Sequence, residues 1–440
     1  MESFALVTTS SSDNQKTPSS FTRSSTTTAL HAAATATTSS ESSSATPDSS
    51  YDVVIVGSGI GGLSAAAMLG KYGYKVCVLE SHYLAGGAAH GFDVRDKENR
   101  LFRFDTGPSF FSGLNADYPA KSSNPLRTIL DAIDERVECV PYESFGLKFP
   151  EGDFIHTTDF SKNVIGQVSG QQGTKQWNRL MDSMEPLAEA VAAMPTAALR
   201  FDVGAALTAG QFLPNFALIK GGPFTTSKLT TPFSSIVNKS VNDSFVRNWL
   251  DLLCFCLSGL PAAGTITAEM AMMMGEFYEP GAVMDCPVGG AKSIIDALVR
   301  GVEKYGGSVF LNSHVDKILI EDGKATGVQM KKGGKTIRAS KAVISNLSVW
   351  DLFGSGIVDQ SKFDASFIAD RKATPVGKSF MHLHVGFKAS REDLEKLQAH
   401  YMYIDDWEMG VDAEDNAVLL SIPSVHDKTL APDGYATLHM

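Results

Sequence analysis

The segment YDVVIVGSGIGG, residues 51–62, decides the fold class. Residues 51–56 are mostly apolar and rich in β-branched side chains, as is typical of a buried parallel strand. This strand runs into Gly57, Gly59 and Gly62, which have the Gly-x-Gly-x-x-Gly spacing of a dinucleotide-binding turn. Gly57 permits the tight turn, Gly59 lets the backbone approach a diphosphate, and Gly62 allows close contact between helix and strand. The segment therefore predicts a βαβ unit that binds an adenine dinucleotide.

The residues that follow complete this unit. The small and apolar run 63–69 predicts a helix, whose N-terminus directs partial positive charge and free N–H groups at the diphosphate. Ser58 and Gly61 lie at the tip of this helix, so we count them with the three glycines as cofactor-binding residues. Residues 75–79 form a second strand, and Glu80 closes it where an acid accepts hydrogen bonds from a ribose hydroxyl. Strand, glycines, helix, strand and acid in this order indicate a dinucleotide site rather than a structural glycine turn.

The next glycines favour FAD over NAD. Gly86 and Gly87 follow shortly after Glu80, and a second glycine pair at this place lets the backbone run beside the ribityl-diphosphate of a flavin. Within residues 103–109 a strand then runs into a polar turn that contains Gly107. We therefore expect Gly86, Gly87 and Gly107 to contribute to the same cofactor site.

Length and composition limit the class of protein. The 440 residues predict two or three domains. A formal net charge of -11 without any basic stretch argues against a nucleic-acid partner. The five cysteines lack Cys-x-x-Cys spacing and indicate buried thiols rather than a disulfide framework or a zinc site. No uninterrupted apolar run is long enough for a membrane-spanning helix.

The first fifty residues differ from the rest in composition. Ser and Thr dominate residues 1–50, which have too little apolar content to fold, so we expect disorder. Such a composition is also typical of plastid and mitochondrial transit peptides. Arg23 and Lys16 fit a transit peptide, whereas acidic residues such as Glu41 do not. The leader therefore predicts either import into an organelle, with the plastid favoured, or a plain disordered extension of a cytoplasmic protein.

After residue 50 the chain resembles the phytoene desaturase and carotenoid isomerase group of amine-oxidase-like flavoproteins, which also contains the retinol saturases. The motifs that carry the resemblance are residues 52–63, 86–90, 104–107, 287–290, 306–309 and 342–346. Residues 405–407, 420–424 and 430–432 are most similar to the carotenoid isomerases.

The resemblance implies an α/β fold with a Rossmann-like FAD-binding domain, built on a doubly wound parallel sheet with a β-meander, and an α+β substrate domain. The implied ranges are 51–135 and 282–346 for the FAD-binding domain, and 136–281 and 347–440 for the substrate domain. In the family, the residue that matches Val315 meets the adenine through backbone groups. The alternative is that Val315 has a purely structural role.

Two departures from the family pattern stand out. Ala88 occupies the position after the second glycine pair where amine oxidases usually have Arg, so that phosphate contact must come from elsewhere. The family ends with a Gly-Asp and a Pro-Gly-rich turn against the flavin, and nothing after Trp407 has that form. We therefore expect the sequence to be C-terminally incomplete, before the last FAD segment.

The implied activity is that of an FAD-dependent isomerase or oxidoreductase acting on long polyenes. The leading hypothesis is cis-to-trans isomerisation of prolycopene-type carotenoids, in which reduced FAD acts catalytically. The alternatives are a carotenoid desaturase, a retinol-saturase-like oxidoreductase, and a non-catalytic fragment. The sequence identifies no catalytic acid or base.

Two further stretches remain open. Residues 188–222 are poor in charge, which predicts either peripheral contact with one membrane leaflet or an ordinary buried helix pair. His382 and His384 stand two apart on an expected strand and so face one side. Because a metal would need a third ligand, we expect a structural pair and no metal site.

Overall fold

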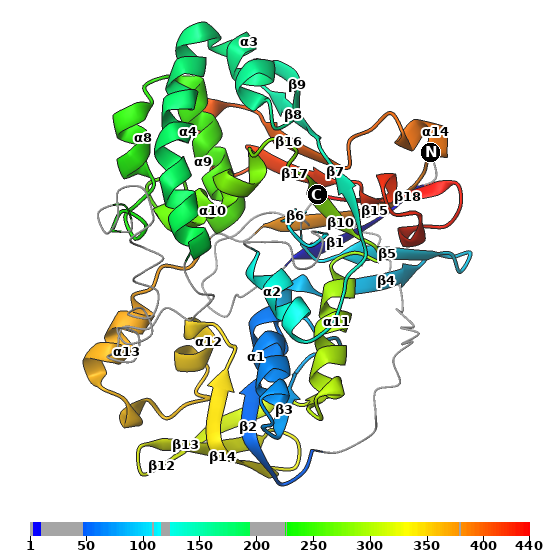
Figure 1. Ribbon diagram of the computed structural model, residues 1–440. Coiled ribbons are helices and arrows are strands. Elements are labelled where there is room, and N and C mark those ends of the chain that lie inside the picture. Colours follow the sequence, from blue (N-terminus) through cyan, green and yellow to red (C-terminus); the bar gives the residue numbers. More distant parts are fainter. Residues whose placement is uncertain are drawn as a thin grey trace, which may run out of the picture.

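The computed structural model describes residues 3–9, 47–107, 110–115, 124–193, 225, 227–377 and 380–440. Two large sheets organise these residues, one in the lower half and one in the upper half of Figure 1. Helices cover both of them, which confirms the expected α/β class.

The lower sheet is built on the predicted nucleotide-binding unit. This unit comprises β2 (Ser50–Val56), α1 (Ile60–Lys71) and β3 (Val76–Leu79). Four later strands complete the sheet: β11 (Ser308–Phe310), β12 (Val315–Glu321), β13 (Lys324–Met330) and β14 (Thr336–Ser345). In the strand order β11-β3-β2-β14-β13-β12, the first four are parallel neighbours and the last three form an antiparallel meander. The expected parallel sheet with a β-meander is confirmed.

Helices pack on both faces of this sheet. Val53 and Ile55 of β2 join the buried cluster under α1 and α11 (Lys292–Lys304). Val54 and Val56 point to the opposite face, as alternation along a strand requires, and join a cluster with residues of α12 (Val349–Gly354) and α13 (Ala365–Lys372). Burial on both faces explains why β2 is almost uninterruptedly apolar.

Two helices that follow the expected domain boundary at residue 347 pack on the nucleotide-binding sheet, and the domain ranges stay a prediction. Phe353 of α12 and Ile368 of α13 are buried against the nucleotide-binding sheet, and Ile357 and Val358 lie in the same cluster. These helices bury apolar side chains on the face of the sheet that α1 leaves open. Residues 349–372 therefore lie with the nucleotide-binding sheet, and the return to the upper sheet comes after them.

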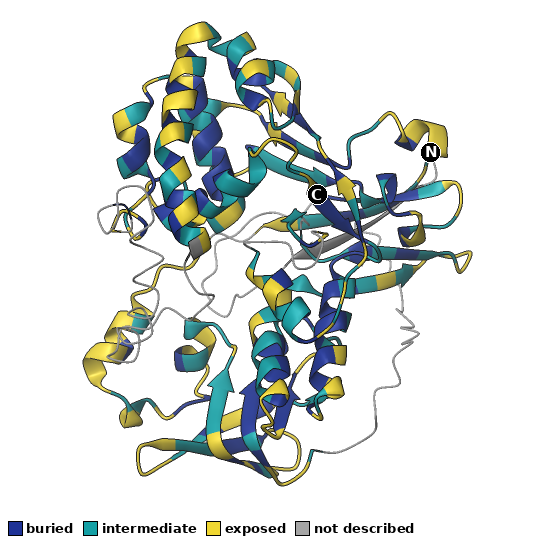
Figure 2. Cartoon of the chain, in the orientation of Figure 1, coloured by how far each residue is buried: buried dark blue, intermediate teal, exposed yellow. Residues whose placement is uncertain are grey.

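The upper sheet and a helical layer form the substrate domain. Its strands are β8 (Phe145–Phe149), β9 (Gly152–His156), β15 (Met381–Lys388), β16 (His400–Ile404), β17 (Ala417–Ser421) and β18 (Tyr435–His439), with β1 (Ser3–Thr9) at one edge. Their order is β1-β15-β18-β17-β16-β8-β9. The main helices are α4 (Gly170–Ala193), α8 (Ser234–Ser240), α9 (Ser244–Ser258) and α10 (Thr267–Phe277). Their inner sides form one large buried core with β8 and β16, seen as dark blue in Figure 2.

A small three-stranded sheet separates the two cores. It has the order β6-β10-β7, with β6 (Phe111–Ser112), β10 (Met284–Pro287) and β7 (Cys139–Tyr142) all antiparallel. Met284 and Cys286 belong to the substrate core, whereas Cys139 belongs to the core under α1. Helix α2 (Pro125–Ala132) and the hairpin of β4 (Gly91–Arg95) and β5 (Leu101–Asp105) flank this partition.

Part of the leader takes a regular structure. Ser3–Thr9 forms β1 and pairs with β15, with partners from Ser3↔Phe387 to Thr9↔Met381. The expected disorder of residues 1–50 therefore does not hold for this short stretch, where the apolar run 4–7 suits a strand. Residues 10–46 lie outside the described residues, so the transit peptide stays a prediction.

The segment expected to touch a membrane is described only at its start. Residues 188–193 form the end of α4, and residues 194–222 lie outside the described part of the chain. Among the residues that are described, no helix has both the length and the apolar composition needed to cross a bilayer.

Candidate dinucleotide-binding site

The glycine turn lies between the end of β2 and the start of α1. Gly57 has a φ of 96°, a conformation that favours glycine, and its amide donates to the Leu79 carbonyl at 2.9 Å. A Cβ atom at Gly62 would collide with the carbonyl oxygen of Gly57, so the third glycine permits the close approach of helix and strand. Gly59 is the N-cap of α1, and no side chain caps the helix there. The tip of α1 therefore presents backbone N–H groups suited to an anionic phosphate.

Glu80 lies directly beside this turn, at the end of β3. Its side chain is 8% exposed. The amide and hydroxyl of Ser58 donate to its Oε2 at 2.9 and 2.7 Å, and the amide of His82 donates to its Oε1 at 2.8 Å. Burial disfavours the charged carboxylate, but these hydrogen bonds more than offset burial and lower the pKa of Glu80 below its ordinary value. Glu80 is thus a fixed anion at the position where a dinucleotide site requires an acceptor for a ribose hydroxyl.

The second glycine pair packs on the first. The amide of Gly86 donates to the carbonyl of Ser58 at 3.0 Å, and Gly86 forms a parallel bridge with Gly59. Gly86 and Gly87 have φ values of 119° and 57°. A Cβ atom on Gly87 would lie 3.1 Å from the Cα atom of Gly59. The structure therefore brings together the two glycine clusters, whose bridged members Gly59 and Gly86 are 27 residues apart in the sequence.

The turn that contains Gly107 is anchored next to this pair. The hydroxyl of Thr106 donates to the carbonyls of Ala88 and His90 at 2.9 and 2.8 Å. A Cβ atom on Gly107 would lie 3.8 Å from the Ala88 carbonyl oxygen. Gly107 therefore lies at the site with Gly86 and Gly87.

Val315 begins β12 and is buried. Just before it, the amide of Ser313 donates to the Glu80 carbonyl at 2.6 Å, and the amide of Asn312 donates to the His82 carbonyl at 2.9 Å. The start of β12 is thus tied to the strand end that carries Glu80. This is the side of the site where an adenosine would lie if Glu80 binds its ribose, and the backbone contact of Val315 with adenine stays a prediction.

Asn346 also lies at the site and was not predicted to do so. Its amide donates to the carbonyl of Val56 at 2.8 Å, and its side chain lies over the glycine turn. A Cβ atom on Gly59 would come 2.6 Å from Nδ2 of Asn346, and one on Gly61 would come 2.9 Å from its Oδ1. The available signal was its place after the strand 342–345, because neighbouring parallel strands end at the same sheet edge.

His382 and His384 have a third histidine beside them. Nδ1 of His382 lies 3.0 Å from Nε2 of His439, and the rings of His384 and His439 stack with centroids 4.4 Å apart. Nε2 of His384 donates to the Asp105 carbonyl at 2.9 Å. Burial lowers the pKa of all three histidines, which favours their neutral form. Through His384, this histidine group connects Asp105, just before the Gly107 turn, to the upper sheet. No group of His, Cys, Asp or Glu within the described ranges has the arrangement of a metal site.

Comparisons with known proteins agree with this site. Residues 55–123 match the family model of an NAD(P)-binding Rossmann-like domain. Over 406 residues the chain is 27% identical to prolycopene isomerase 1, chloroplastic, of Oncidium hybrid cultivar, covering 89% of this chain and 64% of that relative. Prolycopene isomerase, chloroplastic, of Daucus carota is 28% identical over 397 residues, covering 89% of this chain and 61% of the relative. These relatives support the resemblance to the carotenoid isomerase and phytoene desaturase group of amine-oxidase-like flavoproteins.

More distant matches share part of the sequence or only the fold. All-trans-retinol 13,14-reductase of Danio rerio is 25% identical over 411 residues, covering 86% of this chain and 63% of that protein. Putrescine oxidase shares the fold with a TM-score of 0.56 at 16% identity, covering 89% of this chain and 75% of the oxidase. An oxidoreductase of Methanosarcina mazei also has a TM-score of 0.56, at 18% identity and with coverages of 88% and 78%. The chain spans less than two thirds of the length of the curated relatives it matches.

Proposed function

We propose that the site binds FAD. The observation that carries this proposal is the uncapped tip of α1 with the buried Glu80 carboxylate on one side and the second glycine pair on the other. The backbone of residues 57–62 would hold the diphosphate, Glu80 a ribose, and the backbone of Val315 the adenine. Gly86, Gly87 and Gly107 would line the flavin half. Bound FAD would supply a reversible source and acceptor of electrons.

The substrate we propose is a long polyene of the carotenoid class. The prolycopene isomerases among the relatives support this class. The neighbouring core is apolar and aromatic in character: His156 stacks on Phe145 with centroids 4.3 Å apart, and the ring of Phe160 stacks on Trp249 at 4.5 Å. Such surroundings suit an apolar conjugated chain and exclude water.

The reaction we propose is cis-to-trans isomerisation of prolycopene-type carotenoids. Rotation about a double bond becomes feasible when its bond order falls transiently, so the protein's part is to bind, orient and keep the polyene dry. No side chain is assigned as a catalytic acid or base.

Product analysis tests this proposal. The 440-residue chain is expressed in a host that accumulates a poly-cis carotenoid, with Glu80→Leu as the cofactor-site control. Isomerisation changes the absorption spectrum and retention time of the pigment while its mass stays constant. A protein that carries FAD yet leaves the pigment unchanged would refute the proposed reaction.

The second candidate function uses the same site for a net redox reaction, either desaturation or saturation of the substrate. The all-trans-retinol 13,14-reductases among the relatives favour it. Desaturation lowers the product mass by two hydrogens and saturation raises it by two, so the same mass spectrum separates the three reactions.

Peripheral membrane contact and a plastid location complete the proposal. Leu257 and Leu260 at the end of α9 are exposed, as are Phe380 and Met381, and the rings of Phe255 and Phe380 lie 5.6 Å apart. This patch would rest on a lipid surface, from which a polyene partitions. The fraction of protein that floats with liposomes should fall for the double variant Leu257→Ser/Leu260→Ser, and unchanged flotation would dismiss the patch.

The chloroplastic relatives support a location in the plastid. Import of a reporter fused to residues 1–50 tests this location.

A further inference from the structure

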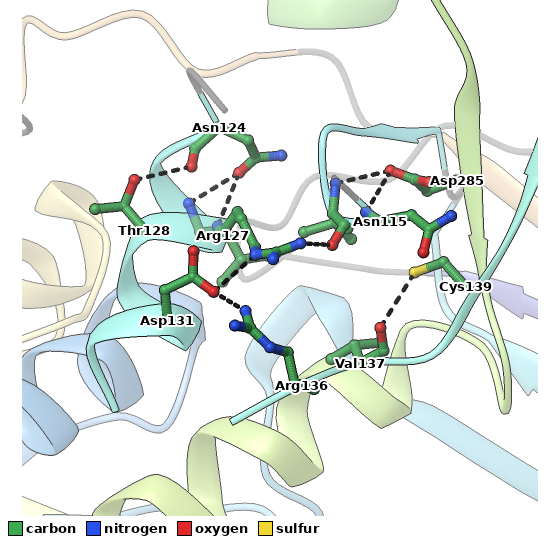
Figure 3. A network of polar contacts seen from close by, with 11 residues as sticks. Asn115, Asn124, Arg127, Thr128, Asp131, Arg136, Val137, Cys139 and Asp285 are labelled. Carbon is green, nitrogen blue, oxygen red and sulfur yellow. Dashed lines mark hydrogen bonds and ion pairs between the residues drawn. The ribbon is translucent and has the colours of Figure 1, made fainter. Parts of the chain in front are cut away.

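The peptide groups of Leu114 are held on both sides by the buried charged side chains of Asp285 and Arg127, both of which are labelled in Figure 3. The amide of Leu114 donates to Oδ2 of Asp285 at 2.7 Å, and the guanidinium of Arg127 donates to the carbonyl of Leu114. The amide of Asn115 donates to the same Oδ2 at 3.3 Å. Asp285 comes from β10 and Arg127 from α2, so two distant parts of the sequence fix one short segment.

Asp285 faces the nucleotide-binding side of the small partition sheet. Its neighbours Met284 and Cys286 are buried in the substrate core, so alternation along β10 directs Asp285 to the opposite face, where Leu114 lies in the core under α1. Asp285 is 1% exposed, and its Oδ1 has no hydrogen-bond partner among the residues that the structure describes. Burial raises the pKa of Asp285, and the amides of Leu114 and Asn115 oppose this effect only in part.

Arg127 is equally fixed. It is 6% exposed, and its Nε donates to Asp131 one helical turn later at 2.8 Å. Arg136 pairs with the same carboxylate (Figure 3). The guanidinium is therefore held toward the Leu114 carbonyl by an acid of its own helix.

Residues 105–107 lie at the proposed flavin site, and the described chain resumes at Phe110 and continues to Leu114. The Asp105 carbonyl accepts from His384, and the Thr106 hydroxyl holds the chain beside the second glycine pair. Gly107 directly follows these two anchored residues in the sequence. Further on, Phe111 pairs with Asp285 across β6 and β10. The hydrogen bonds of Leu114 with Asp285 and Arg127 thus fix the chain on the C-terminal side of Gly107.

We propose that Asp285 and Arg127 are positioning residues, which hold the backbone of Leu114 and thereby fix residues 110–115 on the C-terminal side of Gly107, next to the flavin half of the site. This inference rests on the proposed function, because Gly107 is taken to face FAD. Neither side chain needs to touch the cofactor or the polyene. Both act through the backbone of Leu114.

The test compares Asp285→Leu, Asp285→Asn and Arg127→Met with the unaltered 440-residue chain. Hydrogen exchange of the amides of residues 110–115 is measured without FAD, and FAD affinity and the visible flavin spectrum are measured by titration. Asp285→Leu should speed the exchange and weaken FAD binding about tenfold, with altered fine structure of the flavin band. Asp285→Asn should stay close to the unaltered chain, because an amide oxygen accepts the same two bonds. Arg127→Met should also weaken FAD binding. The double variant Asp285→Leu/Arg127→Met should weaken it little further, because both residues hold the backbone of Leu114.

Asp251→Leu is the matched control. Asp251 also accepts a backbone amide, that of Ala262 at 2.8 Å, but it does so in the substrate domain. Its loss should lower stability and leave the flavin spectrum unchanged.

Several outcomes would overturn the inference. Unchanged exchange at residues 110–115 in Asp285→Leu would do so, and so would faster exchange without any change in FAD affinity or spectrum. An Asp285→Asn variant as impaired as Asp285→Leu would mean that the charge matters rather than the bonds. If Asp285→Leu does not fold, Arg127→Met tests the inference with the same measurements, because it removes the bond to the Leu114 carbonyl. If the unaltered chain binds no FAD, the proposed function fails, and the exchange measurement still decides whether Asp285 and Arg127 hold the segment.

Discussion

Ser58 binds Oε2 of Glu80 twice, through its backbone amide at 2.9 Å and its hydroxyl at 2.7 Å. The same serine accepts the Gly86 amide at its carbonyl, so one residue joins the acid, the first glycine turn and the second glycine pair. Ser58 is fully buried. Glu80 therefore organises the glycine turn from beneath, and in the proposed FAD complex the same carboxylate would accept a hydrogen bond from a ribose hydroxyl.

Glu80→Leu should impair both roles. It leaves the Ser58 and His82 donors buried without an acceptor, which should lower the free energy of unfolding by about 2–3 kcal/mol and weaken FAD binding at least tenfold. Urea unfolding and FAD titration measure the two effects. Glu303→Gln, on the exposed side of α11, should change neither. A Glu80→Leu variant as stable as the unaltered chain would contradict the organising role.

Gly62→Ala should be destabilising for a steric reason. Its Cβ atom would collide with the Gly57 carbonyl, and this backbone contact has no flexible side chain that could move aside. Overpacking of this kind costs about 1–3 kcal/mol, to be measured as a loss in the free energy of unfolding. Gly354→Ala, where nothing lies within 4 Å of the new Cβ atom, is the matched control and should be neutral or slightly stabilising. If the two variants unfold alike, the close approach of α1 to β2 is not what Gly62 provides.

Gly59→Ala separates packing from phosphate binding. The new Cβ atom would come 2.6 Å from the side-chain amide of Asn346, so the variant alone should lose stability. In Gly59→Ala/Asn346→Ala that clash is gone, and stability should return to the value for Asn346→Ala. FAD affinity should remain low in the double variant, because the Cβ atom still blocks approach of the diphosphate to the backbone. Recovery of both properties together would mean that Gly59 serves packing only.

Structure is predicted best from sequence where a single short stretch contains all the residues that determine its conformation. Gly57, Gly59, Gly62 and Glu80 could be placed correctly because strand, turn and helix follow one another without interruption. Asn346 was missed as a site residue because its position depends on which strand becomes the neighbour of β2, and the pairing of β14 with β2 spans almost three hundred residues.

Tertiary contacts of a similar kind explain the other omissions. Asp285 and Arg127 look like ordinary charged residues until β10 and α2 meet around Leu114. His439 could not be joined to His382 and His384 without the pairing of β15 with β18. The packing of α12 and α13 was not foreseen because the expected boundary at residue 347 followed the end of a sheet strand, whereas burial of Phe353 and Ile368 decides where these helices pack.

His156 should make the substrate domain sensitive to acid. Its ring is buried and stacked on Phe145, its Nδ1 has no partner among the described residues, and burial lowers its pKa to about 3. The native state therefore keeps this ring neutral, while the unfolded chain binds a proton below the ordinary pKa of 6.5. Because the unfolded state binds more protons between pH 3 and 6.5, stability is complete above pH 6.5 and falls as the pH drops through that window.

His156→Phe keeps the stack and removes the titration. The slope of unfolding free energy against pH should become shallower by up to about 1.4 kcal/mol per pH unit in this range. Tyr278→Phe, which removes only the hydroxyl 3.3 Å from Nε2 of His156, should leave the slope as it is. Urea unfolding at a series of pH values from 4 to 8 measures all three proteins. Should His156→Phe show the full slope, the acid sensitivity must arise from other buried histidines such as His400, whose pKa burial also lowers to about 3.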